Sequence, residues 1–149
     1  MPGSASPPPL PALHRVLIVD DERLIRSVLS RFFSRRGWMV EESADGDDAL
    51  ARIRSAPDGR FTLIISDVMM PGMSGVELYD RLVATHPELR ARFILASADM
   101  AFPPLVALGE RASCPVIAKP FEFRAIEETV HNAMSGVAKD AAAENGAAA

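Results

Sequence analysis

The chain of 149 residues has a single cysteine, no excess of basic residues and no long apolar run. One cysteine, Cys114, excludes an internal disulfide and a metal site built from several thiolates. A formal net charge of -4 and a pI near 5.4 give no basic excess of the kind that nucleic acid binding requires. No secretory leader and no apolar segment of membrane-crossing length is present. We therefore expect a protein of the reducing cytoplasm that binds neither nucleic acid nor a membrane.

Composition divides the chain into one domain and two tails. Residues 1–13 are rich in proline and small residues, which predicts a disordered N-terminal tail. Residues 136–149 are rich in alanine and have no large apolar residue after Val137 to dock a helix, so we expect a disordered C-terminal tail. Residues 14–135 are about the length of one domain, and the 48% hydrophobic content of the chain can fill one core. We therefore expect no separate output domain within these residues.

Short apolar runs that alternate with helical patterns predict an α/β fold. The runs lie at 16–19, 63–66, 93–96 and 116–118. Each run is too short for a helix and is bounded by turn or polar residues, which is typical of a buried parallel strand. Residues 39–43 predict one more strand, and apolar residues at helical spacing follow every strand. We expect a doubly wound parallel sheet of five strand–helix units.

The first expected helix has an apolar face and a basic face. Its apolar residues, which we expect to pack on the sheet, are Leu24, Ile25, Val28, Leu29, Phe32 and Phe33. The opposite face carries Arg23, Arg26, Arg31, Arg35 and Arg36. On the pattern alone, such a face is more typical of solvated surface than of a docking site. Gly37 is placed to end this helix, and Trp38 to anchor it to the sheet.

A polar residue stands at or just beyond the end of each apolar run. These residues are Asp21 with its neighbour Asp20, Asp67, Ser97 and Lys119. The carboxyl ends of the strands in an open α/β sheet meet at one crevice. We therefore expect these side chains to form a single site.

Three carboxylates in this site predict a metal ion and a phosphoryl group. Each close pair repels by about 4 kcal/mol at an effective dielectric constant of ~20, and a divalent cation offsets that repulsion. Mg²⁺ suits so small a set, because it keeps several waters and takes one or two carboxylates plus phosphate oxygens. With the metal and the Lys119 ammonium screening its charge, a phosphoryl group can be attacked by Asp67 to give an acyl phosphate. Ser97 would donate its hydroxyl to a phosphoryl oxygen.

Four ordered motifs resemble the receiver domain of two-component response regulators. They are Val19-Asp20-Asp21-Glu22, the segment SDVMMPGMSGVEL at 66–78, Ala96-Ser97-Ala98 and Lys119-Pro120-Phe121. The resemblance covers about residues 14–135. It implies a five-stranded flavodoxin-like sheet with the strand order 2-1-3-4-5.

The resemblance also implies roles for the site residues. Asp67 would be phosphorylated from a histidine of a sensor kinase or of a histidine phosphotransfer protein, and Ser97 and Lys119 would be the switch pair. The implied ligands of Mg²⁺, or of Mn²⁺ in its place, are Asp21, Asp67 and the Met69 backbone carbonyl, with Asp20 assisting through water.

Outside the reacting groups, the resemblance implies supporting residues and a docking surface. Pro71, Gly75 and Pro120 would support the loops, with a cis peptide bond before Pro120. The basic first helix, through Arg23, Arg26 and Arg31, would dock the phosphodonor.

We therefore expect a single-domain response regulator that signals by phosphorylation-dependent binding to an unidentified protein, as a monomer or a weak homodimer. It would be a phosphoacceptor that also dephosphorylates itself, and not a turnover enzyme. A phosphatase of the haloacid dehalogenase type is disfavoured, because it needs two aspartates two positions apart, and Glu22 stands two positions after Asp20.

Two features depart from the family pattern. Val116 stands where the family often carries a Tyr or Phe that rotates on activation, and Pro103-Pro104 should shorten the fourth helix to about 105–111. These departures leave open a scaffold that binds its partner without phosphorylation. A phosphate sink that drains a shared kinase would have the same sequence.

Overall fold

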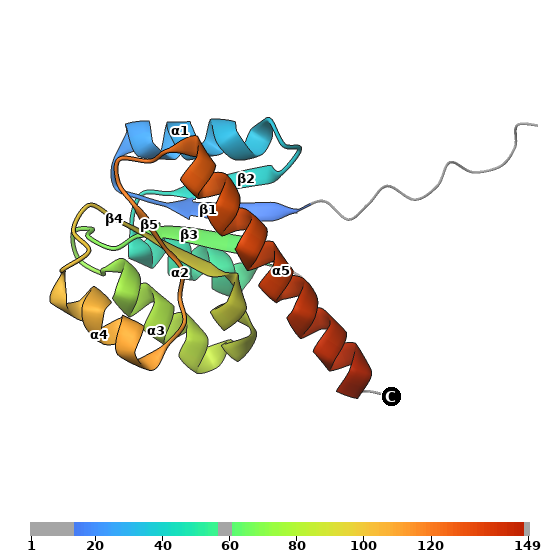
Figure 1. Ribbon diagram of the computed structural model, residues 1–149. Coiled ribbons are helices and arrows are strands. Elements are labelled where there is room, and N and C mark those ends of the chain that lie inside the picture. Colours follow the sequence, from blue (N-terminus) through green and yellow to red (C-terminus); the bar gives the residue numbers. More distant parts are fainter. Residues whose placement is uncertain (1–13, 57–60, 148–149) are drawn as a thin grey trace, which may run out of the picture.

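A five-stranded parallel sheet forms the centre of the computed structural model, which describes residues 14–56 and 61–147, with side chains to residue 137 (Figure 1). The strands are β1 (Arg15–Val19), β2 (Met39–Ser43), β3 (Leu63–Asp67), β4 (Phe93–Ser97) and β5 (Val116–Ala118). Their order in the sheet is β2-β1-β3-β4-β5, and all neighbouring strands are parallel. The expected doubly wound fold and strand order are confirmed.

Helices cover both faces of the sheet. They are α1 (Arg23–Ser34), α2 (Gly46–Ser55), α3 (Gly75–Thr85), the short 3₁₀ helix η2 (Pro87–Arg92), α4 (Pro103–Arg111) and α5 (Phe123–Ala147). Helices α1 and α5 lie on one face, and α2, α3 and α4 lie on the other (Figure 1). None of the described helices combines the length and the apolar character needed to cross a membrane.

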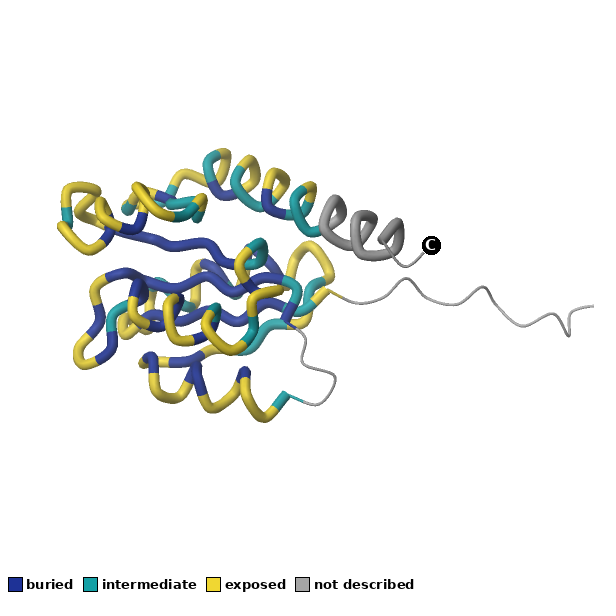
Figure 2. The backbone as a smooth tube through the Cα atoms, turned by 90° about the horizontal axis from the view of Figure 1, so that it is seen from below, coloured by how far each residue is buried: buried dark blue, intermediate teal, exposed yellow. Residues whose placement is uncertain are grey.

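Each face of the sheet has its own apolar core. Val16 and Ile18 of β1 pack with α1 and α5, whereas Leu17 and Val19 pack with the helices of the other face. The central strands are therefore buried on both sides (Figure 2). This explains why their sequences are continuous apolar runs and do not alternate with polar residues.

The inner face of α1 is narrower than the sequence predicts. Leu29, Phe32 and Phe33 are buried against the sheet, but Leu24 is 80% exposed and Val28 is 42% exposed. The apolar stripe of α1 spans more of the helix circumference than the sheet can cover, so its outer edge lies in solvent. The expected anchor is present, because the Trp38 ring packs edge-on against Phe33 with 5.0 Å between ring centroids.

The C-terminal segment also differs from the expectation. A disordered tail is predicted over residues 136–149, whereas α5 continues to Ala147 and extends away from the sheet (Figure 1). Alanine has the highest helix propensity, and a segment that follows a docked helix needs no new nucleation. The two properties together account for the continuation of the helix to Ala147. The tail predicted over 1–13 lies outside the described residues, as do 148–149.

Gly75, at the start of α3, packs against the end of β3. A Cβ atom at this position would lie 2.2 Å from the Asp67 carbonyl oxygen, which is closer than any real contact. The Gly75 amide also donates to the Val68 carbonyl at 2.9 Å. The predicted supporting role of Gly75 thus has a steric basis, since a side chain here would push Asp67 out of place.

We predict that Gly75→Ala destabilises the protein by about 1–3 kcal/mol, because the backbone must shift to admit the methyl group. Gly109→Ala in α4 is the matched control, since a Cβ there meets no atom within 4 Å. The control should be neutral or stabilise by up to about 1 kcal/mol through helix propensity. Urea denaturation measures both variants. Equal unfolding free energies for the two would contradict the steric account.

Candidate functional site

The expected site residues meet at the carboxyl edge of the sheet. Asp20 and Asp21 follow β1, Asp67 is the last residue of β3, Ser97 is the last residue of β4, and Lys119 follows β5. The parallel register aligns these ends, because Asp67 lies beside Ala96 in the sheet and Ser97 lies beside Ala118. The topology thus brings together residues that are as much as 99 positions apart in the chain.

Three carboxylates form the centre of the site. One oxygen each of Asp20, Asp21 and Asp67 lies within 4.8 Å of the others. Asp20 is 1% exposed and Asp67 is 6% exposed, while Asp21 is exposed. Burial, together with the negative charge of Asp20, raises the pKa of Asp67 to about 6. Keeping the Asp67 carboxyl ionised in the folded protein therefore costs free energy.

Lys119 offsets part of that cost. Its Nζ donates to Asp20 Oδ2 at 2.8 Å and lies 3.2 Å from Asp67 Oδ1. Burial alone would disfavour the ammonium, but the hydrogen bond to Asp20 and the charges of both carboxylates outweigh it and raise the pKa of Lys119. One cation therefore bridges the two buried carboxylates.

Asp20 has few groups left for a ligand. Its Oδ1 accepts from the Glu22 amide at 2.9 Å, and its Oδ2 accepts from Lys119. Its own amide donates to the Ser43 carbonyl at 3.1 Å. Asp21 and Asp67 Oδ2 have no hydrogen bond to any residue that the structure describes, so these two carboxylates offer the free oxygens.

The donor set fits Mg²⁺. Clustered carboxylates that lie within reach of one ion, with only part of their charge neutralised by Lys119, are the hard oxygen ligands that this cation takes. Asp21 and Asp67 would bind the ion directly. The carboxylate of Asp20, whose two oxygens already accept hydrogen bonds, would not be a direct ligand. The role implied for the Met69 carbonyl stays a prediction. This residue follows Asp67 by two positions in the loop before α3.

The loop between β3 and α3 is fixed at both ends. The Val68 amide donates to the Ala96 carbonyl at 2.9 Å, and the Ser74 hydroxyl caps α3 by accepting from the Glu77 amide at 3.1 Å. Met70 and Met73 are buried, whereas Pro71 is exposed at the turn. On the other side of the site, the peptide bond before Pro120 is cis, as the resemblance to receiver domains implies.

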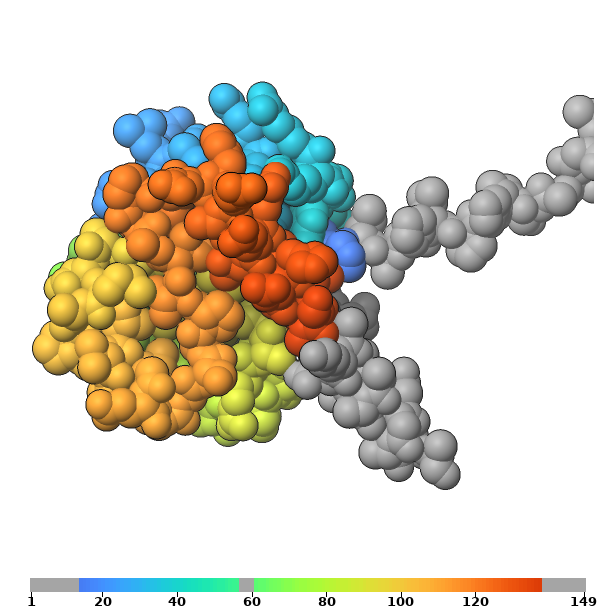
Figure 3. Space-filling model, viewed as in Figure 1, coloured from blue at the N-terminus to red at the C-terminus, as the bar shows by residue number. Residues whose placement is uncertain are grey.

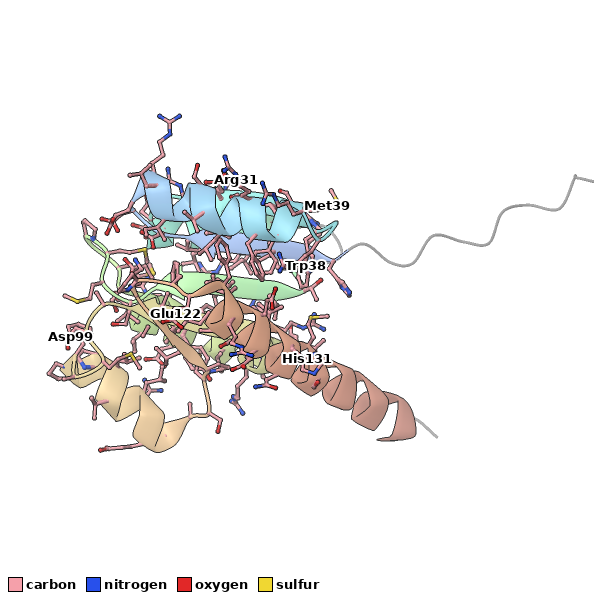
Figure 4. The ribbon with its side chains drawn as sticks, turned by 45° about the horizontal axis from the view of Figure 1, so that its top comes forward. Arg31, Trp38, Met39, Asp99, Glu122 and His131 are labelled. Atoms are coloured by element: carbon pink, nitrogen blue, oxygen red, sulfur yellow. The ribbon has the colours of Figure 1, made fainter. Side chains whose placement is uncertain are left out.

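Ser97 is bound to the loop that follows it. Its buried hydroxyl donates to the Asp99 carbonyl at 2.8 Å and lies 3.1 Å from the Asp99 amide, which donates to it. Asp99 lies in the loop between β4 and α4 (Figure 4). Its carboxylate accepts from the Ala101 amide at 2.9 Å. The hydroxyl expected to meet a phosphoryl group is thus directly linked to the backbone of this loop.

The three arginines expected to dock a phosphodonor do not share one environment. Arg23 and Arg31 are exposed on α1. The Arg26 side chain is only 17% exposed, and its guanidinium donates to the Asp20 carbonyl at 2.7 Å. Arg26 is therefore not presented as a surface cation, which the helical pattern alone could not reveal.

A groove that the sequence did not predict lies between α1 and the start of α5. Figure 3 shows the start of α5 and the loop before it, in orange, against α1, in blue. The groove has a volume of about 720 Å³. Its lining combines the exposed apolar side chains of Leu24, Val28 and Phe123 with Arg31 and Arg35. The sequence feature that could have indicated this groove is the width of the apolar stripe on α1, which is greater than the sheet covers.

Comparison with known proteins points to one family. A model of the response regulator receiver domain matches residues 16–131. The chain is 30% identical over 112 residues to the response regulator receiver protein CpdR of Brucella abortus, covering 75% of this chain and 89% of CpdR. It is 32% identical over 120 residues to the DNA-binding transcriptional regulator NtrC of Azospirillum brasilense, covering 80% of this chain. The chain spans only 24% of NtrC.

Solved structures show the same architecture. A CheY-like receiver domain protein from Methanospirillum hungatei superposes with a TM-score of 0.77 at 25% identity, covering 87% of this chain and 99% of that one. The response regulator TrrA of Thermotoga maritima, in complex with Mg²⁺ and BeF, superposes with a TM-score of 0.70 at 28% identity. That match covers 81% of this chain and 99% of TrrA.

We predict that Asp67→Asn raises the free energy of unfolding at neutral pH, without Mg²⁺, by about 1–2 kcal/mol, because it removes a buried charge and its repulsion. The pKa of Asp67 in the folded protein is raised to about 6 from 3.8. As the pH falls, this carboxyl therefore takes up a proton in the folded protein at a higher pH than in the unfolded chain. The advantage of the variant should therefore shrink between about pH 6 and pH 4.

We predict that Mg²⁺ reverses the order of stability of the wild type and Asp67→Asn. It should raise the melting temperature of the wild type, and much less that of Asp67→Asn or Asp21→Asn, since each variant lacks one free carboxylate. Thermal melts with millimolar MgCl₂ and with EDTA measure this. A variant that gains as much from Mg²⁺ as the wild type would refute the ligand assignment.

Proposed function

The chain belongs to the response regulator receiver domain family, and we propose that Asp67 accepts a phosphoryl group from a phosphohistidine of a partner kinase or phosphotransfer protein. The observation that carries this proposal is the position of Asp67. It ends a central strand, with Lys119 Nζ 3.2 Å from Oδ1 and two further aspartates close by. This arrangement supports a nucleophilic carboxylate facing an electrophile of high negative charge.

The transfer exchanges one bond to phosphorus for another. A carboxylate oxygen of Asp67 forms the new P–O bond, the P–N bond to the imidazole breaks, and the leaving nitrogen keeps the electron pair. Lys119 can stay close to the transferred group and neutralise one of its oxygens. Bound Mg²⁺ would supply further neutralisation of phosphoryl charge. The protein itself becomes the acyl phosphate, so we propose a phosphoacceptor and not a turnover enzyme.

The loop after β4 is the route by which the modification would alter partner binding. The Ser97 hydroxyl is held by Asp99, and the Asp99 carbonyl also accepts from the Phe102 amide at 3.3 Å, just before α4. A phosphoryl oxygen on Asp67 would compete with the Asp99 carbonyl for the Ser97 proton. We propose that this competition rearranges the loop and so changes the surface offered to a downstream protein.

The groove between α1 and α5 supports a docking place for the phosphodonor. Leu24, Val28 and Phe123 offer exposed apolar area, and Arg23 and Arg31 add positive charge near it. A donor helix with apolar and acidic side chains would match this surface. The groove runs along α1 from Leu24 to Arg36, and its Leu24 end is three positions from Asp21 in the chain.

Phosphorylation is tested by intact mass after incubation with acetyl phosphate and MgCl₂. We predict one added phosphoryl group on the wild type, and none on Asp67→Asn or with EDTA in place of the metal. Asp99→Asn, in the neighbouring loop, should still be phosphorylated. Uptake by Asp67→Asn would refute the acceptor assignment. No uptake by the wild type would favour a scaffold that acts without phosphorylation.

Docking is tested by a charge placed in the groove. We predict that Leu24→Asp lowers the rate of phosphotransfer from a histidine kinase that phosphorylates the wild-type chain by about tenfold or more, because the interface must then bury a charge. Uptake from acetyl phosphate should stay within twofold. Val106→Asp, at a side chain that is 47% exposed on α4, is the matched control. Equal losses for both variants would remove the groove as the docking site.

A further inference from the structure

Arg26 has contacts that neither solvation nor docking explains. Its Nη1 donates to the Asp20 carbonyl oxygen at 2.7 Å, and its Nε lies 3.3 Å from Glu42 Oε1. The side chain is 17% exposed, although it starts on the helix face that carries the other arginines. Its guanidinium is therefore directed inward, toward the acidic loop after β1.

We propose that Arg26 is a positioning residue that holds the Asp20–Asp21 peptide in the orientation needed for Mg²⁺ binding. This inference depends on the metal site that the proposed function uses. It replaces the docking role that the sequence suggests for Arg26.

The geometry of one peptide unit carries the argument. The carbonyl of Asp20 and the amide of Asp21 belong to the same planar group, so a hydrogen bond that fixes this carbonyl also fixes the plane from which Asp21 begins. Asp21 is exposed, and its carboxylate has no hydrogen bond to the described residues. The orientation of this ligand therefore depends on the backbone behind it.

The other polar groups of Asp20 are already held. Its amide is bound by the Ser43 carbonyl, its Oδ1 by the Glu22 amide and its Oδ2 by Lys119. Arg26 supplies the remaining contact, to the carbonyl. With all four contacts, Asp20 is a rigid base for Asp21.

Arg26 also contributes charge without competing with the metal. Lys119 binds the carboxylates directly and so occupies oxygens, whereas Arg26 binds the backbone and leaves every carboxylate of the site unchanged. Its positive charge lies at the backbone of the loop that carries Asp20 and Asp21. Glu42, on β2, pairs with the Nε side of the same guanidinium and so also fixes its position.

Neighbouring arginines provide internal comparisons. Arg31 lies on the same helix and is exposed (Figure 4). The Arg36 guanidinium packs 3.6 Å from the centroid of the Phe32 ring and pairs with Glu127. Neither residue contacts the acidic loop. A loss of positive charge on α1 can therefore be separated from the loss of the Asp20 contact.

The test measures Mg²⁺ affinity without any phosphodonor. The dissociation constant is taken from the rise in melting temperature with MgCl₂ concentration for the wild type, Arg26→Met, Arg26→Lys, Glu42→Gln and Arg31→Met. We predict affinity about tenfold or more weaker for Arg26→Met, and a smaller loss for Glu42→Gln. Arg31→Met should stay within twofold of the wild type. Arg26→Lys should recover part of the affinity, because an ammonium can reach one of the two partners.

A merely structural role gives a different result. Arg26→Met would then melt at a lower temperature in EDTA, but its Mg²⁺ dissociation constant would equal that of the wild type, and this outcome would overturn the proposal. An equal loss of affinity in Arg31→Met would overturn it too, by showing that only net charge matters. If Arg26→Met does not fold, Arg26→Lys and Glu42→Gln decide, and wild-type affinity in both would refute the proposal.

Phosphorylation kinetics separate this inference from the proposed function. With acetyl phosphate, Arg26→Met should be slow at low Mg²⁺ and approach the wild-type rate at saturating Mg²⁺. A rate that stays low at saturation would contradict a role limited to metal positioning. If the wild type takes up no phosphoryl group, the proposed function fails, while the Mg²⁺ affinities still decide the role of Arg26.

Discussion

Repulsion between buried carboxylates is the constraint on which the rest of this structure depends. Asp20 and Asp67 lie almost fully out of water beside Asp21, and an arrangement of like charges persists only where other groups oppose it. Lys119 does so directly, by bridging Asp20 and Asp67. The polar contacts around Asp20 then hold the cluster in one geometry. The negative charge that Lys119 leaves unbalanced is a reason to expect a divalent cation at this site.

Much of this site was predictable because parallel α/β sheets place the ends of their strands together. The apolar runs located β1, β3, β4 and β5, and the polar residues after them then had to meet, as Asp20, Asp67 and Lys119 do. The strand order required the resemblance to a known family, since periodicity does not reveal which strands are neighbours. The extension of α5 was missed because the expectation weighed docking contacts and gave too little weight to helix propagation.

The side-chain details of α1 lay beyond the sequence pattern. Leu24 and Leu29 contribute equally to an apolar stripe, but only Leu29 is covered, because the width of the sheet decides which part of the stripe is buried. Arg23, Arg26 and Arg31 look alike in the same way. Only the position of the Asp20 carbonyl, in a loop whose conformation no local pattern specifies, distinguishes Arg26. Periodicity assigns residues to faces, whereas contacts with loops need the folded backbone.

The length of α5 makes it a lever arm. The helix begins four residues after Lys119 and continues for 25 residues, or about 37 Å at 1.5 Å per residue. A rotation of one degree at its first turn moves its far end by about 0.6 Å. A change at the acidic site that tilted α5 would therefore displace the backbone least near Lys119 and most at the Ala147 end of the helix.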